Sequence, residues 1–302
     1  MTSQKYFERL LIVVVIFCVF FFITMMLLSV MIQGFAIDFN TRNGKLIAST
    51  IQALMVFIAP SLVAARLITR SPLSYLELKK APGWLPILGA IFAYMIALPA
   101  MNQIIYWNST MILPEWIADW SVDFKQMEES AQNSASMMLD TASFGGMIIN
   151  LLVIGLLTAF GEEIFFRGAL QRTVAAPGWN HLAIWIVAII FSAAHFQIFG
   201  FFPRLILGAW LGYLLYWTRS LYVPVFAHFL NNAVVVVCSW LSFKGIEFNQ
   251  DMFGVVESGF PFPALVSALA LFIFLFCFKN FFFKSKADKS EKSYESDLQL
   301  EN

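Results

Sequence analysis

The residues of this chain with the clearest capacity for chemistry lie within or next to its apolar segments. Glu162 and Glu163 stand side by side after an apolar run over residues 147–160, and Arg167 follows four residues after Glu163. On a helix, Glu163 and Arg167 share one face and can form an ion pair. Glu162 then points about 100° away from that face. One carboxylate is therefore expected to be paired, which leaves Glu162 free for chemistry. The alternative is a helix that ends at the membrane surface, with both acids in headgroup water.

Three further polar residues occur in later apolar segments. His195 follows Phe191 by four residues, and Asn232 follows His228 by four residues, which places each pair on one helical face. A single histidine in a membrane helix is more often a packing residue than a catalyst. Inside a membrane, however, each buried polar group needs a partner. We therefore expect these side chains and the glutamates to meet in one hydrated cavity.

These residue types fit the hydrolysis of a peptide bond, which needs an activated water and a stabilised oxyanion. A carboxylate in an apolar site is suited to act as a general base near neutral pH. Glu162 with His195 can hold and deprotonate the water. His228 and Asn232 can donate hydrogen bonds to the oxyanion, each contributing ~3–4 kcal/mol. No serine or cysteine stands in a triad-like relation to these groups, so covalent catalysis is not favoured.

The same residues also permit a chemistry that uses a metal. Glu162, His195 and His228 would make a zinc site of two histidines and one carboxylate, with an open position for water. The metalloprotease signature His-Glu-x-x-His does not occur in the sequence. We therefore favour catalysis by glutamate without a cofactor, and we keep zinc as the alternative.

Composition indicates that membrane helices position these residues. Of the 302 residues, 60% are hydrophobic and 13% are charged, whereas a soluble domain is about half apolar and about a quarter charged. The predicted fold class is all-α, a polytopic membrane helix bundle of about eight transmembrane helices. The predicted spans are residues 10–35, 46–68, 85–107, 145–174, 181–198, 202–217, 221–241 and 263–283. Gly208 and Gly212 have the spacing that allows close packing of helices, and Pro60 is expected to bend the second span.

The distribution of charge predicts how the bundle is oriented. An even number of spans places both termini on one side, and most of the 19 lysines and arginines then fall on that side. By the positive-inside rule, both termini are cytoplasmic. We expect residues 1–283 to form a single membrane domain, with a motif-bearing core at 145–241.

Two polar segments are expected to lie outside the membrane. Residues 108–144 carry six acidic residues and one lysine, which predicts an acidic extracytoplasmic loop. The loop is expected to cap the bundle, and Trp116 and Trp120 can anchor a short amphipathic helix on the membrane surface. A plain linker is the alternative. Residues 284–302 are charged and rich in serine, which predicts a disordered cytoplasmic tail.

Helix geometry leaves one conflict, which concerns depth in the membrane. If the fourth span starts outside at residue 145, Glu162 lies about 25 Å along it, near the inner side. If the fifth span starts inside at residue 181, His195 lies about 21 Å along it, near the outer side. A fourth helix that continues past Arg167 would set Glu162 deeper. The sequence alone does not resolve the relative depth of the two residues.

Three motifs together resemble those of a known family. Glu162-Glu163-x-x-x-Arg167, Phe191-x-x-x-His195 and His228-x-x-x-Asn232 occur in this order. They are similar to the motifs of the CAAX-processing and bacteriocin-processing (CPBP or Abi) intramembrane endopeptidases, which include the CAAX prenyl endopeptidase. The resemblance covers roughly residues 151–237. It implies an eight-helix bundle with a site near the cytoplasmic leaflet. It also implies catalytic roles for Glu162, His195, His228 and Asn232, and supporting roles for Glu163, Arg167 and Phe191.

The predicted function is therefore an intramembrane endopeptidase of the cell membrane. A site within the bilayer implies a membrane-embedded or lipidated peptide or protein substrate that arrives laterally. We expect a multi-pass protein of a bacterial plasma membrane, with the lipid bilayer and no nucleic acid among its partners. One alternative is a proton-coupled transporter, in which Glu162, His195 and His228 form a relay. The other is a non-proteolytic bacteriocin-immunity or scaffold protein of the same fold.

Overall fold

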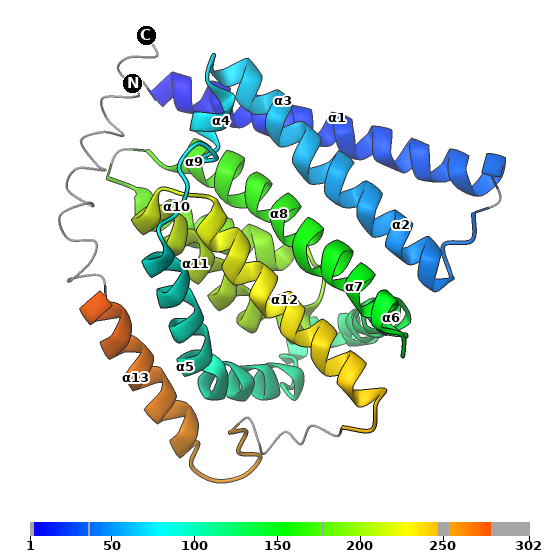
Figure 1. Cartoon of the computed structure of the whole chain (residues 1–302), viewed down its shortest axis with the longest axis vertical. Coiled ribbons are helices and arrows are strands. Elements are labelled where there is room, and N and C mark those ends of the chain that lie inside the picture. The colour runs from blue at the N-terminus through cyan, green and yellow to red at the C-terminus, as the bar shows by residue number, and fades with distance from the viewer. Residues whose placement is uncertain (1–2, 36, 177, 247–253, 279–302) are drawn as a thin grey trace.

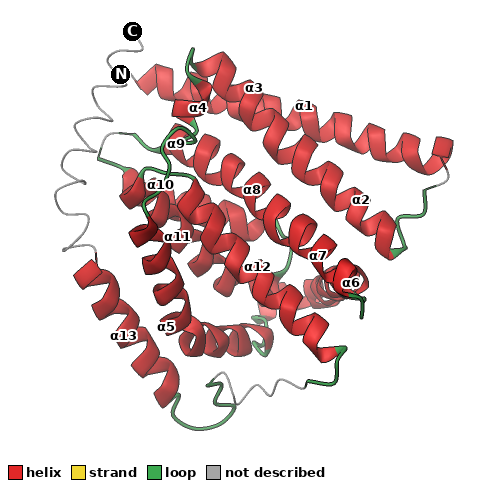
Figure 2. Ribbon diagram, in the orientation of Figure 1, coloured by secondary structure: helices red, strands yellow, loops and turns green. Residues whose placement is uncertain are grey.

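A computed structural model describes residues 3–35, 37–176, 178–246 and 254–278 (Figure 1). Within these ranges every secondary-structure element is helical (Figure 2). In lipid, a helix satisfies its own backbone N–H and C=O groups, which an isolated strand cannot do. The predicted all-α fold is therefore confirmed. The predicted tail at 284–302, and residues 279–283 of the predicted eighth span, lie outside the described residues.

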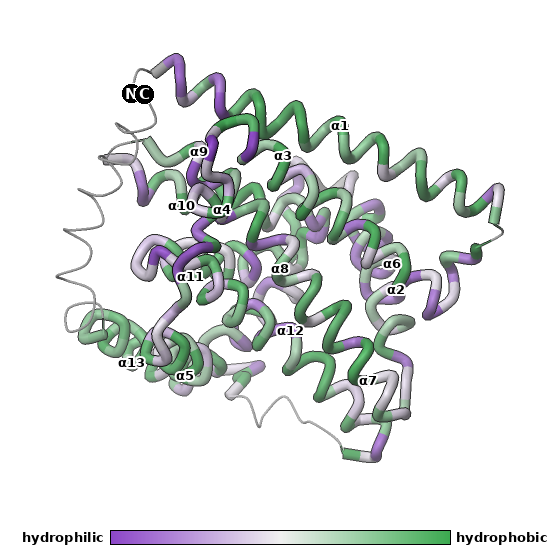
Figure 3. The backbone as a smooth tube through the Cα atoms, turned by 45° about the horizontal axis from the view of Figure 1, so that its top comes forward, coloured by the Kyte–Doolittle hydropathy of each residue, from purple (hydrophilic) through white to green (hydrophobic). Residues whose placement is uncertain are grey.

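Eight apolar helical segments account for the predicted spans. By length and composition, six can cross a membrane: Gln4–Phe35, Arg42–Ile68, Trp84–Ser109, Phe144–Val174, Ile198–Thr218 and Tyr222–Ser242. Two shorter apolar helices are α10 (Asn180–Ala193) and α13 (Phe262–Phe278). Figure 3 shows α1 (Ser3–Phe35) and α13 as hydrophobic along most of their length. Large apolar side chains of α1 such as Phe22 and Met26 are exposed, as expected of a surface that faces lipid.

Two of the long segments contain stretches of π-helix. The second span comprises α2 (Arg42–Gln52), the π-helix η1 (Ala53–Ile58) and α3 (Ala59–Ile68). Pro60 lies two residues after η1. Proline lacks an N–H group and its ring clashes with the carbonyl four residues back, and a π-helical turn widens the backbone at that place.

The fourth span is the longest of those near the candidate site. It comprises α7 (Phe144–Asn150), the π-helix η3 (Leu151–Leu157), α8 (Thr158–Glu163), the π-helix η4 (Ile164–Gln171) and α9 (Arg172–Val174). It lies between the second span and α12 (Tyr222–Ser242) (Figure 1). π-helical turns occur often at functional sites, and here two of them flank the glutamate pair.

One end of the bundle, called the basic end below, is closed by residues 69–83. This connection contains α4 (Pro72–Tyr75) and leads into α5 (Trp84–Ser109). Glu77 holds it in place, because its carboxylate pairs with Arg172 at 2.8 Å and with Arg219 at 3.0 Å, and its carbonyl accepts from the Leu221 N–H. Several cations that were predicted to be cytoplasmic lie in this connection or at the ends of the helices next to it. They are Arg66, Arg70, Lys79, Lys80, Arg172 and Arg219.

The opposite end, called the acidic end below, carries the segment predicted as a loop. Much of residues 108–144 is helical, as the 3₁₀ turn η2 (Glu115–Trp120) and α6 (Ser121–Leu139). Polar contacts fasten α6 to the start of α2. Arg42 donates to the Met138 carbonyl at 3.2 Å, and Lys45 donates to Ser134 at 3.1 Å. The segment therefore covers this end of the bundle as a helix.

Candidate active site

The fourth span places Glu163 and Arg167 at the centre of the bundle. Both side chains are fully buried, and Arg167 Nη1 lies 2.8 Å from Glu163 Oε1. The predicted ion pair between these residues is confirmed. All eight residues of η4 are buried, so this part of the helix has no contact with lipid.

Arg167 also binds the helix on its other side. Its Nη2 donates to the Gly208 carbonyl of α11 (Phe201–Thr218) at 2.9 Å, and its guanidinium carbon lies 4.5 Å from the centre of the Phe191 ring. A cation over an aromatic face is stabilised electrostatically. A Cβ at Gly208 would lie 3.1 Å from the Phe191 ring and 3.3 Å from the backbone of Ala188. Glycine therefore allows α10 and α11 to pack closely at this point, as its spacing predicted.

A second contact repeats this arrangement one turn along. Gln171 donates to the Gly212 carbonyl at 3.2 Å. A Cβ at Gly212 would lie 2.9 Å from the Ile184 side chain. The side chains at 167 and 171 thus bind the carbonyls of two glycines that are also four residues apart. The sequence reasoning did not include Gln171, although its spacing from Arg167 matches that of the glycines.

His228 binds the same carboxylate as Arg167. Its Nδ1 lies 2.9 Å from Glu163 Oε1, and its Nε2 lies 3.8 Å from Glu162 Oε2. A carboxylate paired with arginine is an acceptor, so Nδ1–H donates to Glu163. The other ring nitrogen is left on the side of Glu162. The sequence contained no signal for the contact between Glu163 and His228, which are 65 positions apart.

Glu162 has a different environment from its neighbour. Its side chain is 12% exposed, and among the described residues no side chain or backbone group donates a hydrogen bond to it. His228 lies nearby, and His195 and Arg204 also interact with its charge. The predicted division is therefore confirmed, since Glu163 is paired with Arg167 and Glu162 is not.

The backbone of α10 fixes the orientation of His195. Its Nδ1 lies 2.8 Å from the Phe191 carbonyl. A carbonyl only accepts hydrogen bonds, so Nδ1 carries the proton and Nε2 is available as an acceptor. The centre of the Phe191 ring lies 5.0 Å from that of His195 and 6.0 Å from that of His228. Phe191 is thus in contact with both histidines and with Arg167, which agrees with the supporting position predicted for it.

Asn232 lies one turn beyond His228 on α12. Its Nδ2 donates to the Ile154 carbonyl of η3 at 3.2 Å, and its Oδ1 accepts from Asn231 at 3.3 Å. A primary amide has two N–H groups, so one remains for another acceptor. The role of Asn232 toward an oxyanion stays a prediction.

The depth conflict disappears when both residues are measured from the basic end of the bundle. The fourth span continues to Val174, which puts Glu162 about 18 Å from the basic end. The predicted fifth span at 181–198 was too long, because α10 ends at Ala193 and Phe196 has a left-handed backbone (φ 54°). His195 lies about 22 Å from the start of α10. The two residues therefore lie at similar depths.

The zinc alternative requires Glu162, His195 and His228 to share one metal ion. Both histidines have Nδ1 engaged in a hydrogen bond. The possible metal ligands are therefore Nε2 of each histidine and a carboxylate oxygen of Glu162. Within the described ranges, however, no three His, Cys, Asp or Glu side chains are grouped closely enough to hold a metal ion. As they stand, these side chains do not fit a metal.

Fold and site together define a polytopic membrane protein with buried ionisable groups. The segment that carries the site is similar to known proteins. Residues 144–234 match the family model of the type II CAAX prenyl endopeptidase Rce1-like proteins. The uncharacterized protein YpbD of Bacillus subtilis (strain 168) is 35% identical over 91 residues, which are 29% of this chain and 44% of that protein. The match thus spans less than half of this curated relative. No solved structure matches the chain.

The family comparison confirms the resemblance that the three motifs indicated. The matched segment contains all of the predicted site residues, from Glu162 to Asn232. Residues 144–234 of this multi-pass membrane protein are thus similar to the Rce1-like endopeptidases.

Proposed function

We propose that this chain is an intramembrane endopeptidase in which Glu162 acts as the general base. The observation that carries the proposal is that the two adjacent glutamates have different bonding partners. Glu163 is committed to Arg167 and to His228 Nδ1, while Glu162 has no hydrogen bond within the described part of the chain and faces His228 Nε2. Family membership of the matched segment supports proteolysis as the reaction class.

In the proposed reaction, a water molecule binds between Glu162 and His195. His195 Nε2 accepts one hydrogen bond from the water and orients it, because Nδ1–H is fixed to the Phe191 carbonyl. Glu162 removes the other proton as the water oxygen attacks the scissile carbonyl carbon. Glu162 then returns this proton to the leaving amine, so that its carboxylate is regenerated.

His228 and Asn232 are proposed to stabilise the tetrahedral intermediate. Glu163 holds Nδ1–H of His228, and in the imidazolium form Nε2–H would donate to the oxyanion. The N–H of Asn232 that does not bind Ile154 supplies a second donor. Removal of one such donor costs about 10²–10³ in kcat in known enzymes.

The proposed substrate is a membrane-embedded or lipidated peptide or protein, and the proposed location is a bacterial plasma membrane. The test uses purified full-length protein in liposomes and a fluorescence-quenched peptide with a lipid anchor. Glu162→Gln is expected to abolish cleavage without a change in melting temperature. Glu8→Gln, which changes an exposed glutamate of α1, is the control and is expected to cleave normally. Normal turnover by Glu162→Gln would refute the assignment.

A further inference from the structure

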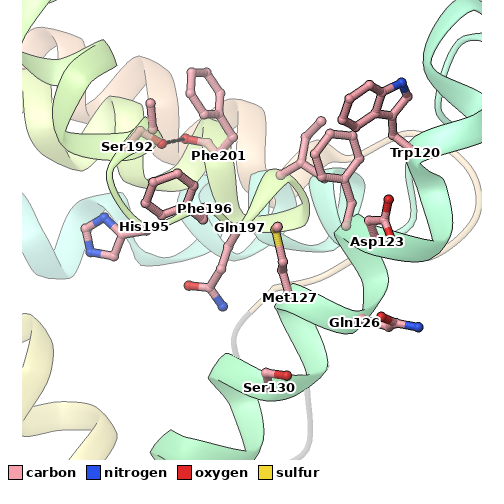
Figure 4. Close-up of a pocket in the computed structure, with 13 residues that line it drawn as sticks. Trp120, Asp123, Gln126, Met127, Ser130, Ser192, His195, Phe196, Gln197 and Phe201 are labelled. Atoms are coloured by element: carbon pink, nitrogen blue, oxygen red, sulfur yellow. Dashed lines mark hydrogen bonds between the residues drawn. The ribbon is translucent and has the colours of Figure 1, made fainter. Parts of the chain in front are cut away.

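A cavity of about 740 Å³ lies between α6 and the turn that joins α10 to α11 (Figure 4). This volume falls within the range of about 300–1,000 Å³ that is typical of ligand pockets. The lining is mainly apolar on both sides. One wall consists of Trp120 at the end of η2 with Phe124 and Met127 of α6, and the facing wall contributes Ala193, Phe196 and Phe201.

The cavity adjoins the candidate active site. His195 forms part of its wall, on the side away from α6 (Figure 4). His195 is thus common to the cavity and the candidate active site. Trp120 and Phe196 are 61% and 73% exposed, which shows that the cavity is open at its outer end.

The opposite approach to the site is closed. Leu76 and Leu221 are fully buried at the basic end. Leu76 packs against Gly168, where an added Cβ would lie 3.2 Å from the leucine side chain. The Tyr75 hydroxyl also forms a buried hydrogen bond of 2.8 Å with Thr173. A peptide that reached Glu162 from this end would have to displace a packed core, whereas the cavity under α6 is already open.

α6 is held in a way that allows it to move. None of its residues is buried. Besides the contacts from α2, the Gln197 amide donates to Glu128 at 3.1 Å, and Gln197 in turn accepts from Arg204. A helix with no buried side chain and a few polar contacts opens locally at low free energy. α6 can therefore separate from the turn to admit an extended chain.

The charges of α6 favour a cationic ligand. Asp123 lines the cavity, and α6 carries three acids, Asp123, Glu128 and Glu129, against one cation, Lys125. The nearby Arg204 is already engaged by Gln197. An apolar segment would fill the cavity, and basic residues next to it would meet the acids of α6.

We propose that this cavity binds the apolar segment of a membrane-associated peptide, whose flanking basic residues lie along α6. The peptide reaches His195 and Glu162 from the acidic end of the bundle. This inference rests on the proposed function and adds the substrate class and the route of entry.

Binding is tested separately from cleavage. The probe is a synthetic peptide with an apolar segment, adjacent lysines and a photo-crosslinking side chain, added to full-length Glu162→Gln protein in liposomes. Crosslinks are expected on α6 and on residues 193–201. Ser130→Trp, which fills the cavity, is expected to reduce crosslinking ~10-fold or more, equivalent to ~1.4 kcal/mol. Asn133→Trp, at an exposed α6 position outside the lining, is the matched control and is expected to crosslink normally.

Three results would overturn the proposal. They are crosslinks confined to residues 69–83, unchanged crosslinking in Ser130→Trp, and equal crosslinking of a peptide whose lysines are replaced by glutamates. Crosslinking in the cavity without cleavage by the wild-type protein would support the binding site and refute the protease. Cleavage by the wild type without crosslinks in the cavity would support the protease and refute the binding site.

The side of entry is tested in sealed membrane vesicles. Glu129→Cys, in a protein whose native cysteines at 18, 238 and 277 are serines, reports by a membrane-impermeant maleimide which face carries α6. The peptide is expected to crosslink when added to that face. Crosslinking only from the opposite face would refute entry at the acidic end.

Discussion

Replacement of Arg167 by alanine tests the central contact of the site. The substitution removes the ion pair with Glu163, the hydrogen bond to the Gly208 carbonyl and the contact with the Phe191 ring. Glu163 would remain fully buried with only His228 as a partner. Arg167→Ala is therefore expected to reduce both stability and activity.

The size of the effect follows from burial. Removal of one member of a buried ion pair destabilises by ~3–5 kcal/mol, because the other charge stays buried without its partner. An exposed pair contributes only about 0–1 kcal/mol. With about 2–4 °C of melting temperature per kcal/mol for chains of 150–250 residues, the loss should be roughly 6 °C or more. Arg66→Ala, at an exposed position of α3, is expected to melt close to the wild type.

The assay is thermal unfolding of purified variants in detergent, followed by far-UV circular dichroism. Glu163→Gln and the double variant Glu163→Gln/Arg167→Ala complete a mutant cycle. The double variant is expected to be more stable than the sum of the two single losses predicts, because it leaves no unpaired charge. If Arg167→Ala melted like Arg66→Ala, the ion pair would contribute nothing measurable and the reasoning would fail.

The remaining predictions concern packing, histidine choice and metal content. Gly208→Val should lower the melting temperature and activity together, because its side chain would collide with Phe191 and Ala188, whereas a variant with wild-type properties would contradict the packing account. His181→Ala should retain wild-type cleavage, since His181 contacts Tyr213 and Tyr216 at the start of α10 and not the site residues; loss of activity would show that the wrong histidines were assigned. Mass spectrometry should find no stoichiometric metal in the active protein, and a chelator should leave cleavage unchanged; one zinc per chain that is lost together with activity would support the metal alternative.

Local patterns predicted the fold and one half of the site. Hydropathy is a property of consecutive residues, so the eight apolar segments were readable from sequence. The ion pair between Glu163 and Arg167 depends only on helical spacing, which made it predictable as well. The close helix contact at Gly208 and Gly212 was also predictable, because their spacing indicates such a contact before the partner helix is known.

Contacts between distant segments were not predictable in this way. The bond between His228 and Glu163 joins helices far apart in the sequence, and no spacing rule addresses such a pair. The end of α10 at Ala193 was missed because apolar residues continue after it, so hydropathy does not mark the turn at His195. The cavity under α6 depends on this turn, together with an amphipathic segment whose packing partner the sequence does not specify.

A chain of partners explains why two adjacent glutamates are useful in this site. The Gly208 carbonyl orients Arg167, Arg167 pairs with Glu163, Glu163 holds His228 Nδ1, and His228 Nε2 is thereby directed to the side of Glu162. Successive residues on a helix point about 100° apart, so neighbouring carboxylates cannot bind the same group equally. One glutamate is thus fixed by buried partners, while the other retains a free carboxylate beside an oriented histidine. Environments that differ between neighbouring titratable groups are the usual basis for assigning separate acid–base and supporting roles. In this chain the difference follows from the position of a single arginine, one helical turn after the second glutamate.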